Sequence, residues 1–305
     1  MNAIEIHALT KKFNGLTAVD NIELEIGEGE LFGLLGPNGA GKTTTISMLS
    51  TILTPSSGNA KVWEKDIVKQ RDDVRKTIGI VFQDPSLDDE LTGKENLDFH
   101  GRLYGLDAKE REERINEVLK LVELEDRAKS LVKTYSGGMK RRLEIARGLM
   151  HKPKVLFLDE PTIGLDVVSQ KKMRDFIKEY NRREKSTIIL TSHYMGDVKE
   201  LCQRVIIIDK GKLIFDGQLA EITEKYADHK IISAVLAKEI DPKKLEEIGK
   251  IKEYSFPKVV FLVRREAASV AAAELLQHFP VADLNIEEIP IEDIIREVFT
   301  GQNVA

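Results

Sequence analysis

The sequence lacks the features of an exported or membrane-spanning protein. Its 305 residues include a single cysteine, so no disulfide can form within the chain. Cys202 lies in a segment of apolar periodicity, which is typical of a buried thiol in a reducing compartment. No run approaches the roughly 18 consecutive apolar residues of a membrane-spanning helix. The chain begins with the alternating segment 4–9 and not with a basic stretch followed by an apolar one. We therefore expect a cytoplasmic protein that reaches a membrane only through a partner.

The sequence also lacks an excess of basic residues. The net charge is −5, and the short basic run 140–142 is more typical of a functional helix than of a nucleic-acid surface. We therefore expect no nucleic-acid partner. Hydrophobic residues (42%) and charged residues (32%) suit a globular chain. A length of 305 residues favours two domains, because single cores seldom grow past about 250 residues.

A glycine-rich segment is the strongest motif in the chain. It follows the apolar run 31–35, precedes the helical pattern 44–53 and fits G-x-x-x-x-G-K-[ST] with residues Gly36, Pro37, Asn38, Gly39, Ala40, Gly41, Lys42, Thr43 and Thr44. In such a loop, backbone N–H groups at a helix N-terminus surround the phosphates and the lysine reaches the β- and γ-oxygens. The threonine hydroxyl ligates Mg²⁺. A chance glycine-rich turn would not need both flanks, so the pattern predicts a nucleoside triphosphate site.

Polar side chains follow three further apolar strand patterns. Gln83 follows the run 78–82, Asp159 and Glu160 close the run 155–158, and His193 comes after the run 187–191. The carboxyl ends of strands are where α/β folds place ligand contacts. We expect Gln83 to touch Mg²⁺ or the attacking water, Asp159 to hold Mg²⁺ through water and Glu160 to polarise the attacking water. The alternatives are an exposed acid pair and a histidine that is satisfied elsewhere in the fold.

A second helix start carries the same chemistry. Ser136 is a natural N-cap, and Gly137 and Gly138 leave the first amides uncovered ahead of a helix with core spacing up to residue 150. Phe13, ahead of the phosphate loop, could stack on a base or could cover a small sheet. The sequence therefore predicts two phosphate-binding helix termini in one chain, and the function of the second terminus requires an explanation.

In this order and spacing, the segments resemble the ATP-binding subunit of the ABC transporter family over about residues 3–223. The resemblance assigns Walker A to 36–43, the Q-loop to Gln83, the signature to 135–139, Walker B with its glutamate to 155–160, the D-loop to 164–166 with Asp166, and the switch histidine to His193. Phe13 takes the place of the adenine-stacking aromatic, which is more often tyrosine. The signature departs from the commoner LSGGQ in Tyr135 and Met139.

The resemblance implies both a fold and a dimer. The fold is an α/β P-loop NTPase of ABC type over residues 1–223, with a RecA-like core, an N-terminal antiparallel β subdomain and a helical subdomain at about 84–150. In the dimer, Ser136, Gly137, Gly138 and Met139 of one subunit would cap the ATP in the phosphate loop of the other. The second subunit would be another copy of this chain, with ATP and Mg²⁺ as ligands. An integral membrane permease on a separate chain would hold the protein at the cytosolic face of the cell membrane.

The subfamily is indicated by three segments. The YSGGM signature with its basic continuation, the acidic stretch 86–92 and the ending 290–295 resemble the drug-resistance and polysaccharide or lipid export ATPases, which pair with separate ABC-2 type permeases. An importer subunit would share all of the ATP chemistry. A non-transport ABC ATPase acting on nucleic acid or ribosomes usually carries two ATPase halves or a long coiled-coil insertion, and this sequence has neither.

Residues 224–305 carry none of these motifs. Strand and helix patterns alternate there as strand 230–236, helix 241–248, strands 250–254 and 258–263, helix 267–278 and strand 281–288. This order predicts an α+β, ferredoxin-like accessory domain, closed by a short helix at 291–299. A ligand sensor and a dimerisation or docking module both fit, and the second is favoured because no polar cluster marks a pocket.

Overall fold

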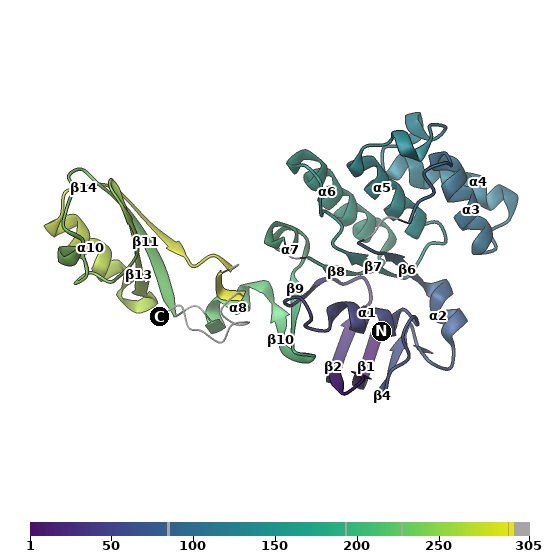
Figure 1. Ribbon diagram of the computed structural model, residues 1–305, viewed down its shortest axis with the longest axis horizontal. Coiled ribbons are helices and arrows are strands. Elements are labelled where there is room, and N and C mark those ends of the chain that lie inside the picture. The colour runs from purple at the N-terminus through teal and green to yellow at the C-terminus, as the bar shows by residue number, and fades with distance from the viewer. Residues whose placement is uncertain (84–85, 193, 227, 292, 296–305) are drawn as a thin grey trace. The chain divides into compact units, whose positions relative to one another are not determined.

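The computed structural model describes residues 1–83, 86–192, 194–226, 228–291 and 293–295, and the side chains of all of these but 223–226. Two compact units follow one another along the chain, Met1–Asp216 and Gly217–Ala305 (Figure 1). The boundary expected at residue 223 lies inside α8 (Leu219–Tyr226), which belongs to the second unit.

The first unit is built on a six-stranded sheet in the order β10-β9-β3-β8-β7-β6. The strands from β9 to β6 pair in parallel, and β10 follows β9 through a tight turn. Both faces are covered, which is why these strands are short continuous apolar runs. Their bounds are β3 Leu31–Leu35, β6 Ile78–Val81, β7 Val155–Asp159, β8 Thr187–Thr191, β9 Arg204–Asp209 and β10 Lys212–Gln218.

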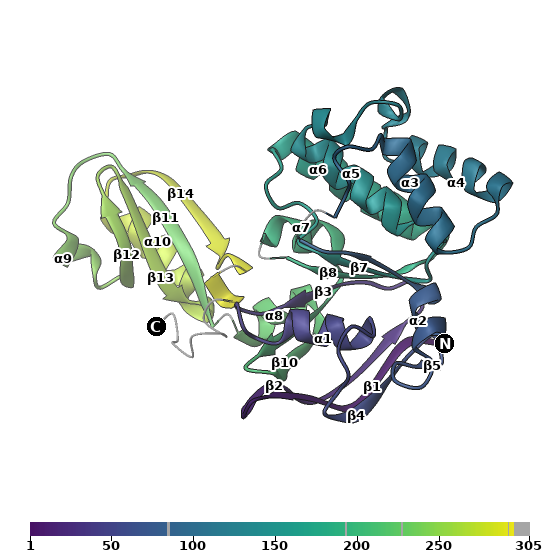
Figure 2. The same ribbon diagram turned by 45° about the vertical axis from the view of Figure 1, so that its right-hand side comes forward.

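Helices and a second sheet enclose this sheet (Figure 2). On one face lies α1 (Lys42–Leu49), and beyond it an antiparallel sheet ordered β2-β1-β4-β5. Apolar side chains of α1 and of both sheets form one core. On the other face lie α6 (Val167–Glu184) and α7 (Met195–Leu201). The remaining bounds are β1 Asn2–Phe13, β2 Leu16–Gly27, β4 Ser57–Val62, β5 Lys65–Asp66 and α2 Arg71–Thr77.

A separate group of helices carries the signature segment (Figure 1). It contains α3 (Gly93–Leu103), α4 (Ala108–Leu121), the short turns Glu125–Arg127 and Val132–Thr134, and α5 (Gly137–Gly148). The chain turns between α3 and α4 at Gly105, where φ is +74°. Asp107 then caps α4 by accepting from two backbone N–H groups.

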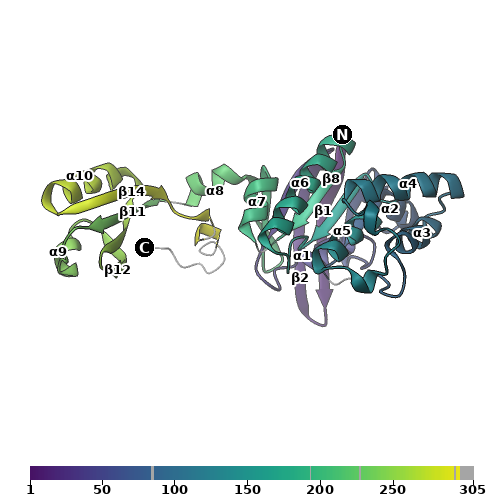
Figure 3. The same ribbon diagram turned by 90° about the horizontal axis from the view of Figure 1, so that it is seen from above.

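The second unit holds the predicted ferredoxin-like arrangement. Its antiparallel sheet has the order β12-β13-β11-β14, and α10 (Ala268–His278) lies along it (Figure 3). The order of elements predicted from the sequence is confirmed, although the first helix shortens to α9 (Pro242–Leu245). The predicted helix 291–299 lies mostly outside the described residues. The strand bounds are β11 His229–Leu236, β12 Lys250–Ser255, β13 Lys258–Arg264 and β14 Val281–Glu288.

Among the described residues, no helix is long and apolar enough to cross a membrane.

Candidate nucleotide-binding site

The carboxyl ends of the central strands meet at one edge of the six-stranded sheet. Asp159, the last residue of β7, lies opposite Thr191, the last residue of β8, and Thr191 lies opposite Leu34 of β3. Val81, the last residue of β6, lies opposite Leu158. The parallel register therefore brings together the segments that follow four strands far apart in the sequence.

Glycine is required in the loop between β3 and α1. A Cβ on Gly36 would lie 2.3 Å from the carbonyl oxygen of Ile208, and one on Gly41 would lie 2.5 Å from that of Ala18. Gly41 also has a φ of +107° and stands at the N-cap of α1. The loop therefore keeps its backbone exposed at the start of a helix, where N–H groups favour an anion.

Lys42 is held over the loop. Its Nζ donates to the carbonyl oxygens of Gly36 at 2.6 Å and Pro37 at 3.1 Å. Burial lowers the pKa of Lys42, while the nearby carboxylates of Glu160 and Asp159 raise it. An ammonium has three N–H donors, so in the part of the chain that the structure describes two are directed at the loop and one can face a phosphate.

The two acids at the end of β7, Asp159 and Glu160, are fixed by β8. The Thr191 hydroxyl donates to Asp159 Oδ1. The Glu160 backbone N–H donates to Thr191 O at 3.1 Å, and Glu160 has a left-handed φ of +48°. That conformation is costly for a residue with a side chain and is tolerated where the surroundings impose it, as at functional sites.

These groups line one pocket of about 180 Å³. Its walls are Asn38, Gly39, Ala40, Gly41, Lys42, Thr43, Thr44, Gln83, Asp159 and Glu160. Helix-terminal amides and an ammonium suit phosphate oxygens, and a hydroxyl, a carboxylate and an amide oxygen are the donors that Mg²⁺ accepts beside water. The residues present therefore fit a triphosphate with its metal.

The expected adenine contact, Phe13, is not part of this pocket. Phe13 ends β1 and is 41% exposed, and Lys11 Nζ lies 5.1 Å from its ring centroid. It is therefore not a buried cover of the small sheet. His193 lies outside the described residues.

The signature segment begins α5 at an exposed helix terminus. Ser136 caps it, with its hydroxyl accepting from the Met139 N–H at 3.3 Å, as the sequence predicts. Tyr135 is buried and its hydroxyl donates to Arg127 O at 2.6 Å, so the ring that replaces leucine anchors the segment. Ser136 and Gly137 are exposed and do not line the described pocket.

Asp166 has a local role of its own. Its carboxylate caps α6, accepting from the Ser169 N–H at 3.0 Å and from the Ser169 hydroxyl at 2.6 Å. The hydrogen bonds from Ser169 lower the pKa of Asp166.

Two buried charged residues beside the site are not predicted by the sequence. Arg141, within the basic run of α5, contacts the backbone around Gln83 and Glu160. Asp197 of α7 contacts Thr162 and Ser192. The only signal in the sequence is the spacing of Arg141 and Glu144 by one helical turn, which also occurs on exposed helix faces.

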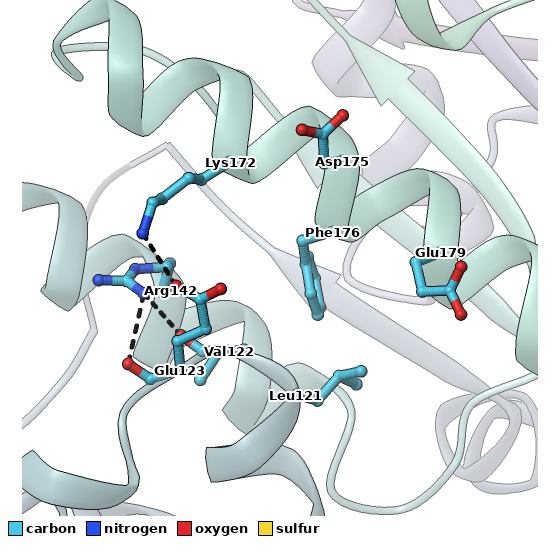
Figure 4. A pocket seen from close by; sticks show the side chains of 8 residues that line it. All are labelled: Leu121, Val122, Glu123, Arg142, Lys172, Asp175, Phe176 and Glu179. Carbon is cyan, nitrogen blue, oxygen red and sulfur yellow. Dashed lines mark hydrogen bonds and ion pairs between the residues drawn. The ribbon is translucent and has the colours of Figure 1, made fainter.

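A second pocket, of about 250 Å³, has different chemistry (Figure 4). It lies between the end of α4 and α6, lined by Leu121, Val122, Glu123, Arg142, Lys172, Asp175, Phe176 and Glu179. Lys172 pairs with Glu123 at 3.0 Å, and Arg142 donates to Val122 O at 2.8 Å. Lys172 and Arg142 already contact oxygens of this pocket, and the pocket has no exposed N–H groups of a helix terminus among its described residues. It is therefore less suited to bind a phosphate than the glycine loop is.

Comparisons with known proteins agree with this geometry. The family described as ABC transporter matches residues 19–163, and the EvrA-like ABC transporter C-terminal domain matches residues 228–287. The linearmycin resistance ATP-binding protein LnrL of Bacillus subtilis (strain 168) is 42% identical over 234 residues, 77% of this chain and 75% of that protein. The Nod factor export ATP-binding protein I of Cupriavidus metallidurans is 35% identical over 271 residues, 88% of this chain and 89% of that protein.

Among solved structures, the fold is similar to a dimeric ATP-binding cassette, MJ0796, in a post-hydrolysis state bound to ADP and Pi. The TM-score is 0.64 and the identity 27%, covering 70% of this chain and 98% of that one. The predicted α/β fold, with its RecA-like core and antiparallel subdomain, is confirmed. The chain therefore belongs to the ATP-binding subunits of the ABC transporter family, whose members bind and hydrolyse ATP.

Proposed function

We propose that this chain is one half of an ATP-dependent dimer that drives an export permease carried on a separate polypeptide. The observation that carries the proposal is the pocket in which the glycine loop, Gln83 and the acids after β7 come together. The loop amides and Lys42 bind the phosphates, and the exposed ring of Phe13 offers a face for adenine.

Thr43, Gln83 and Asp159 are the residues we assign to the metal. Bound Mg²⁺ would neutralise phosphate charge. Thr191 fixes one Asp159 oxygen by donating to it, which leaves the other to accept from metal-bound water.

Glu160 is the group we assign to the attacking water. Its backbone is held by Thr191, so its carboxylate projects from a fixed point beside Lys42. A carboxylate in that position accepts a proton or a hydrogen bond from water. Gln83 and His193 complete the catalytic set in this proposal, and His193 lies outside the described residues.

The second anion-facing helix terminus supports a dimer. Ser136 and Gly137 are exposed and lie outside the pocket of their own chain. We infer that Ser136, Gly137, Gly138 and Met139 meet the ATP of a second copy, with Asp166 near the interface. The solved structure of the ATP-binding cassette MJ0796 is a dimer, which supports two such subunits acting together.

Export is favoured over import by the names of the relatives. They are called linearmycin resistance and Nod factor export ATP-binding proteins. We infer a peripheral position at the cytosolic face of the membrane, with contact made through the permease.

The permease contact is best placed on α3. Phe99 and Leu103, one turn apart, are 60% and 66% exposed, and Ile52 is 55% exposed. His100 and Tyr104, which directly follow Phe99 and Leu103 in the sequence, line together with Ile52 part of a cavity of about 220 Å³. An exposed apolar group around a groove favours an apolar segment of a partner. We therefore assign this surface to a cytosolic segment of the permease.

The dimer is tested with Glu160→Gln. The variant keeps the phosphate contacts but loses the carboxylate that orients water, so we expect ATP to be bound and turnover nearly abolished, leaving a long-lived dimer. Size exclusion with ATP and Mg²⁺ measures this. A variant that stays monomeric and hydrolyses ATP normally would refute the assignment.

The permease surface is tested with the double variant Phe99→Asp, Leu103→Asp. We expect ATP binding to persist while recovery with detergent-solubilised membranes falls, because two charges would be buried at the contact. Asn116→Asp, on the exposed side of α4, is the matched control. Equal membrane recovery of both variants would place the contact elsewhere.

A further inference from the structure

Arg141 uses all of its hydrogen-bonding capacity inside the protein. Its side chain is buried, with 6% exposed. Nε donates to Pro161 O at 3.1 Å, one terminal nitrogen donates to Asp159 O at 2.6 Å and Glu160 O at 3.1 Å, and the other donates to Phe82 O and Glu144 Oε2. A guanidinium has five N–H donors, so each has an acceptor.

Four of these acceptors are backbone carbonyls of residues that line the nucleotide pocket or directly adjoin its lining residues. Phe82 directly precedes Gln83, and Asp159 to Pro161 carry the two acids after β7. Arg141 therefore joins the two segments that we assign to the metal and to the attacking water. It contacts them through the main chain, so it fixes where their side chains begin.

The face of α5 that carries Arg141 holds the Q-loop at a second point. Glu144 Oε1 accepts from the Ser86 N–H at 2.7 Å, and Arg147 donates to Ser86 O at 2.6 Å. Three charged residues spaced by one turn therefore hold both sides of the segment that contains Gln83. A shift of α5 would move these anchors together.

The same helix begins with the signature segment. Ser136 caps α5 only five residues before Arg141, and a helix is rigid over so short a distance. In the proposed dimer, the N-terminus of α5 would face the partner's nucleotide, while a side chain in its second turn is hydrogen-bonded to the segments that form the pocket of its own chain.

We propose that Arg141 couples the two ATP sites of the dimer: it transmits the position of the signature segment, set by the partner's nucleotide, to Gln83 and Glu160 of its own site. Arg141 is a positioning residue in this role, since it is not among the residues that line the described pocket. The inference rests on the proposed dimer. Coupling between sites is reciprocal, so weakening this link should impair both sites.

The test uses heterodimers in which only one ATP site can close. One subunit carries Ser136→Arg and its partner carries Lys42→Ala. In the proposed dimer the altered signature of the first subunit faces the altered phosphate loop of the second, so both substitutions damage the same ATP site. The remaining site uses the phosphate loop of the first subunit and the signature of the second. Both subunits also carry Glu160→Gln to slow turnover. The measurement is ATP retained after rapid gel filtration of full-length, differently tagged subunits.

Arg141→Lys is then added to one subunit at a time. In the first subunit, the Arg141→Lys substitution lies in the chain that supplies the intact phosphate loop. In the second subunit, the substitution lies on the helix α5 that supplies the intact signature. Lysine keeps the charge but has fewer donors and no planar fork, so we expect ATP retention to fall roughly tenfold in either position. The control is Lys140→Ala, which removes an ion pair with Asp89 on the same helix and should leave retention unchanged.

The outcomes separate the inference from the proposed function. A loss confined to the first subunit would make Arg141 a local support of its own site and overturn the coupling, as would no loss in either subunit. Failure of the heterodimer with intact Arg141 to retain ATP would instead overturn the dimer itself. Unchanged ATP binding by the isolated Arg141→Lys subunit establishes that the variant folds, and Arg141→Gln is the second variant if it does not.

Discussion

Asp197 shows how single buried residues stabilise the region around the site. Its side chain is fully buried on α7, where its carboxylate accepts from the hydroxyls of Thr162 and Ser192 and pairs with Arg174 of α6 at 3.0 Å. Thr162 follows the acids of β7, and Ser192 follows β8. One carboxylate thus connects the segment that follows the pocket residues Asp159 and Glu160, the residue after β8, and helix α6.

Asp197→Ala should destabilise the first unit strongly. It leaves the hydroxyls of Thr162 and Ser192 without their acceptor and removes one of the two carboxylates that pair with Arg174, the other being Glu200 at 2.6 Å. A buried polar group that loses its partner costs about 1–3 kcal/mol. Denaturant unfolding of the nucleotide-free chain, followed by fluorescence of its single tryptophan, Trp63, measures the change. Glu179→Ala, which removes an exposed pair with Arg182, is the control and should change little. Equal midpoints for the two variants would contradict this account of Asp197.

At the scale of elements, an aromatic contact joins α3 to the chain after α5. The rings of Tyr104 and His151 stack with centroids 3.7 Å apart, and His100 lies 5.0 Å from Tyr104. Burial is the main cause that lowers the pKa of both histidines to about 4, and Arg147 near His100 and Arg114 near His151 act in the same direction. His151 Nε2 lies 2.8 Å from Ile78 O, which acts against the shift.

The stability of the first unit should therefore fall as the pH is lowered from about 6.5 toward 4. In this range the unfolded histidines bind protons and the folded ones do not, so the unfolded state gains protons and is favoured. Between pH 7 and 5 we expect a loss of roughly 1–2 kcal/mol per histidine. Unfolding midpoints across this range measure it. His100→Gln or His151→Gln should reduce the dependence of the unfolding midpoint on pH, whereas replacement of the exposed His7 should not. If all of these variants showed the same dependence on pH, the contact of His100, Tyr104 and His151 would be excluded as its cause.

Elements with a continuous apolar pattern could be predicted from the sequence. Strands such as β8 (Thr187–Thr191) and the ferredoxin-like order of the second unit follow from apolar periodicity and turns. The break between α3 and α4 could not, because apolar spacing continues across it and only Gly105 marks the turn. The glycine loop and the acids Asp159 and Glu160 could be predicted, because each motif stands at the end of an apolar run that is typical of a strand. Arg141 and Asp197 could not, since a buried charge and an exposed one look alike in sequence.

At the scale of the whole molecule, the proposed function depends on two helix termini that would bind different nucleotides. The start of α1 lines the pocket with Lys42, whereas the start of α5 lies outside that pocket with Ser136 exposed. In the proposed dimer, each subunit would supply a phosphate loop to one site and a signature to the other. The proposed ATP site shared between two subunits is central, because three proposals depend on it. They are the ATP-dependent dimer, the coupling through Arg141 and the use of ATP to drive a permease.

Retention of ATP by mixed subunits tests this claim most directly. Subunits with Ser136→Arg and subunits with Lys42→Ala are each expected to retain almost no ATP alone, since both sites of either homodimer are damaged. Mixed, they should retain close to one ATP per heterodimer, because both lesions fall on one site and the other is built from intact parts. If the Ser136→Arg homodimer retained as much ATP as the mixture, the helix that begins at Ser136 would not meet the partner's nucleotide, and the shared ATP site would be contradicted.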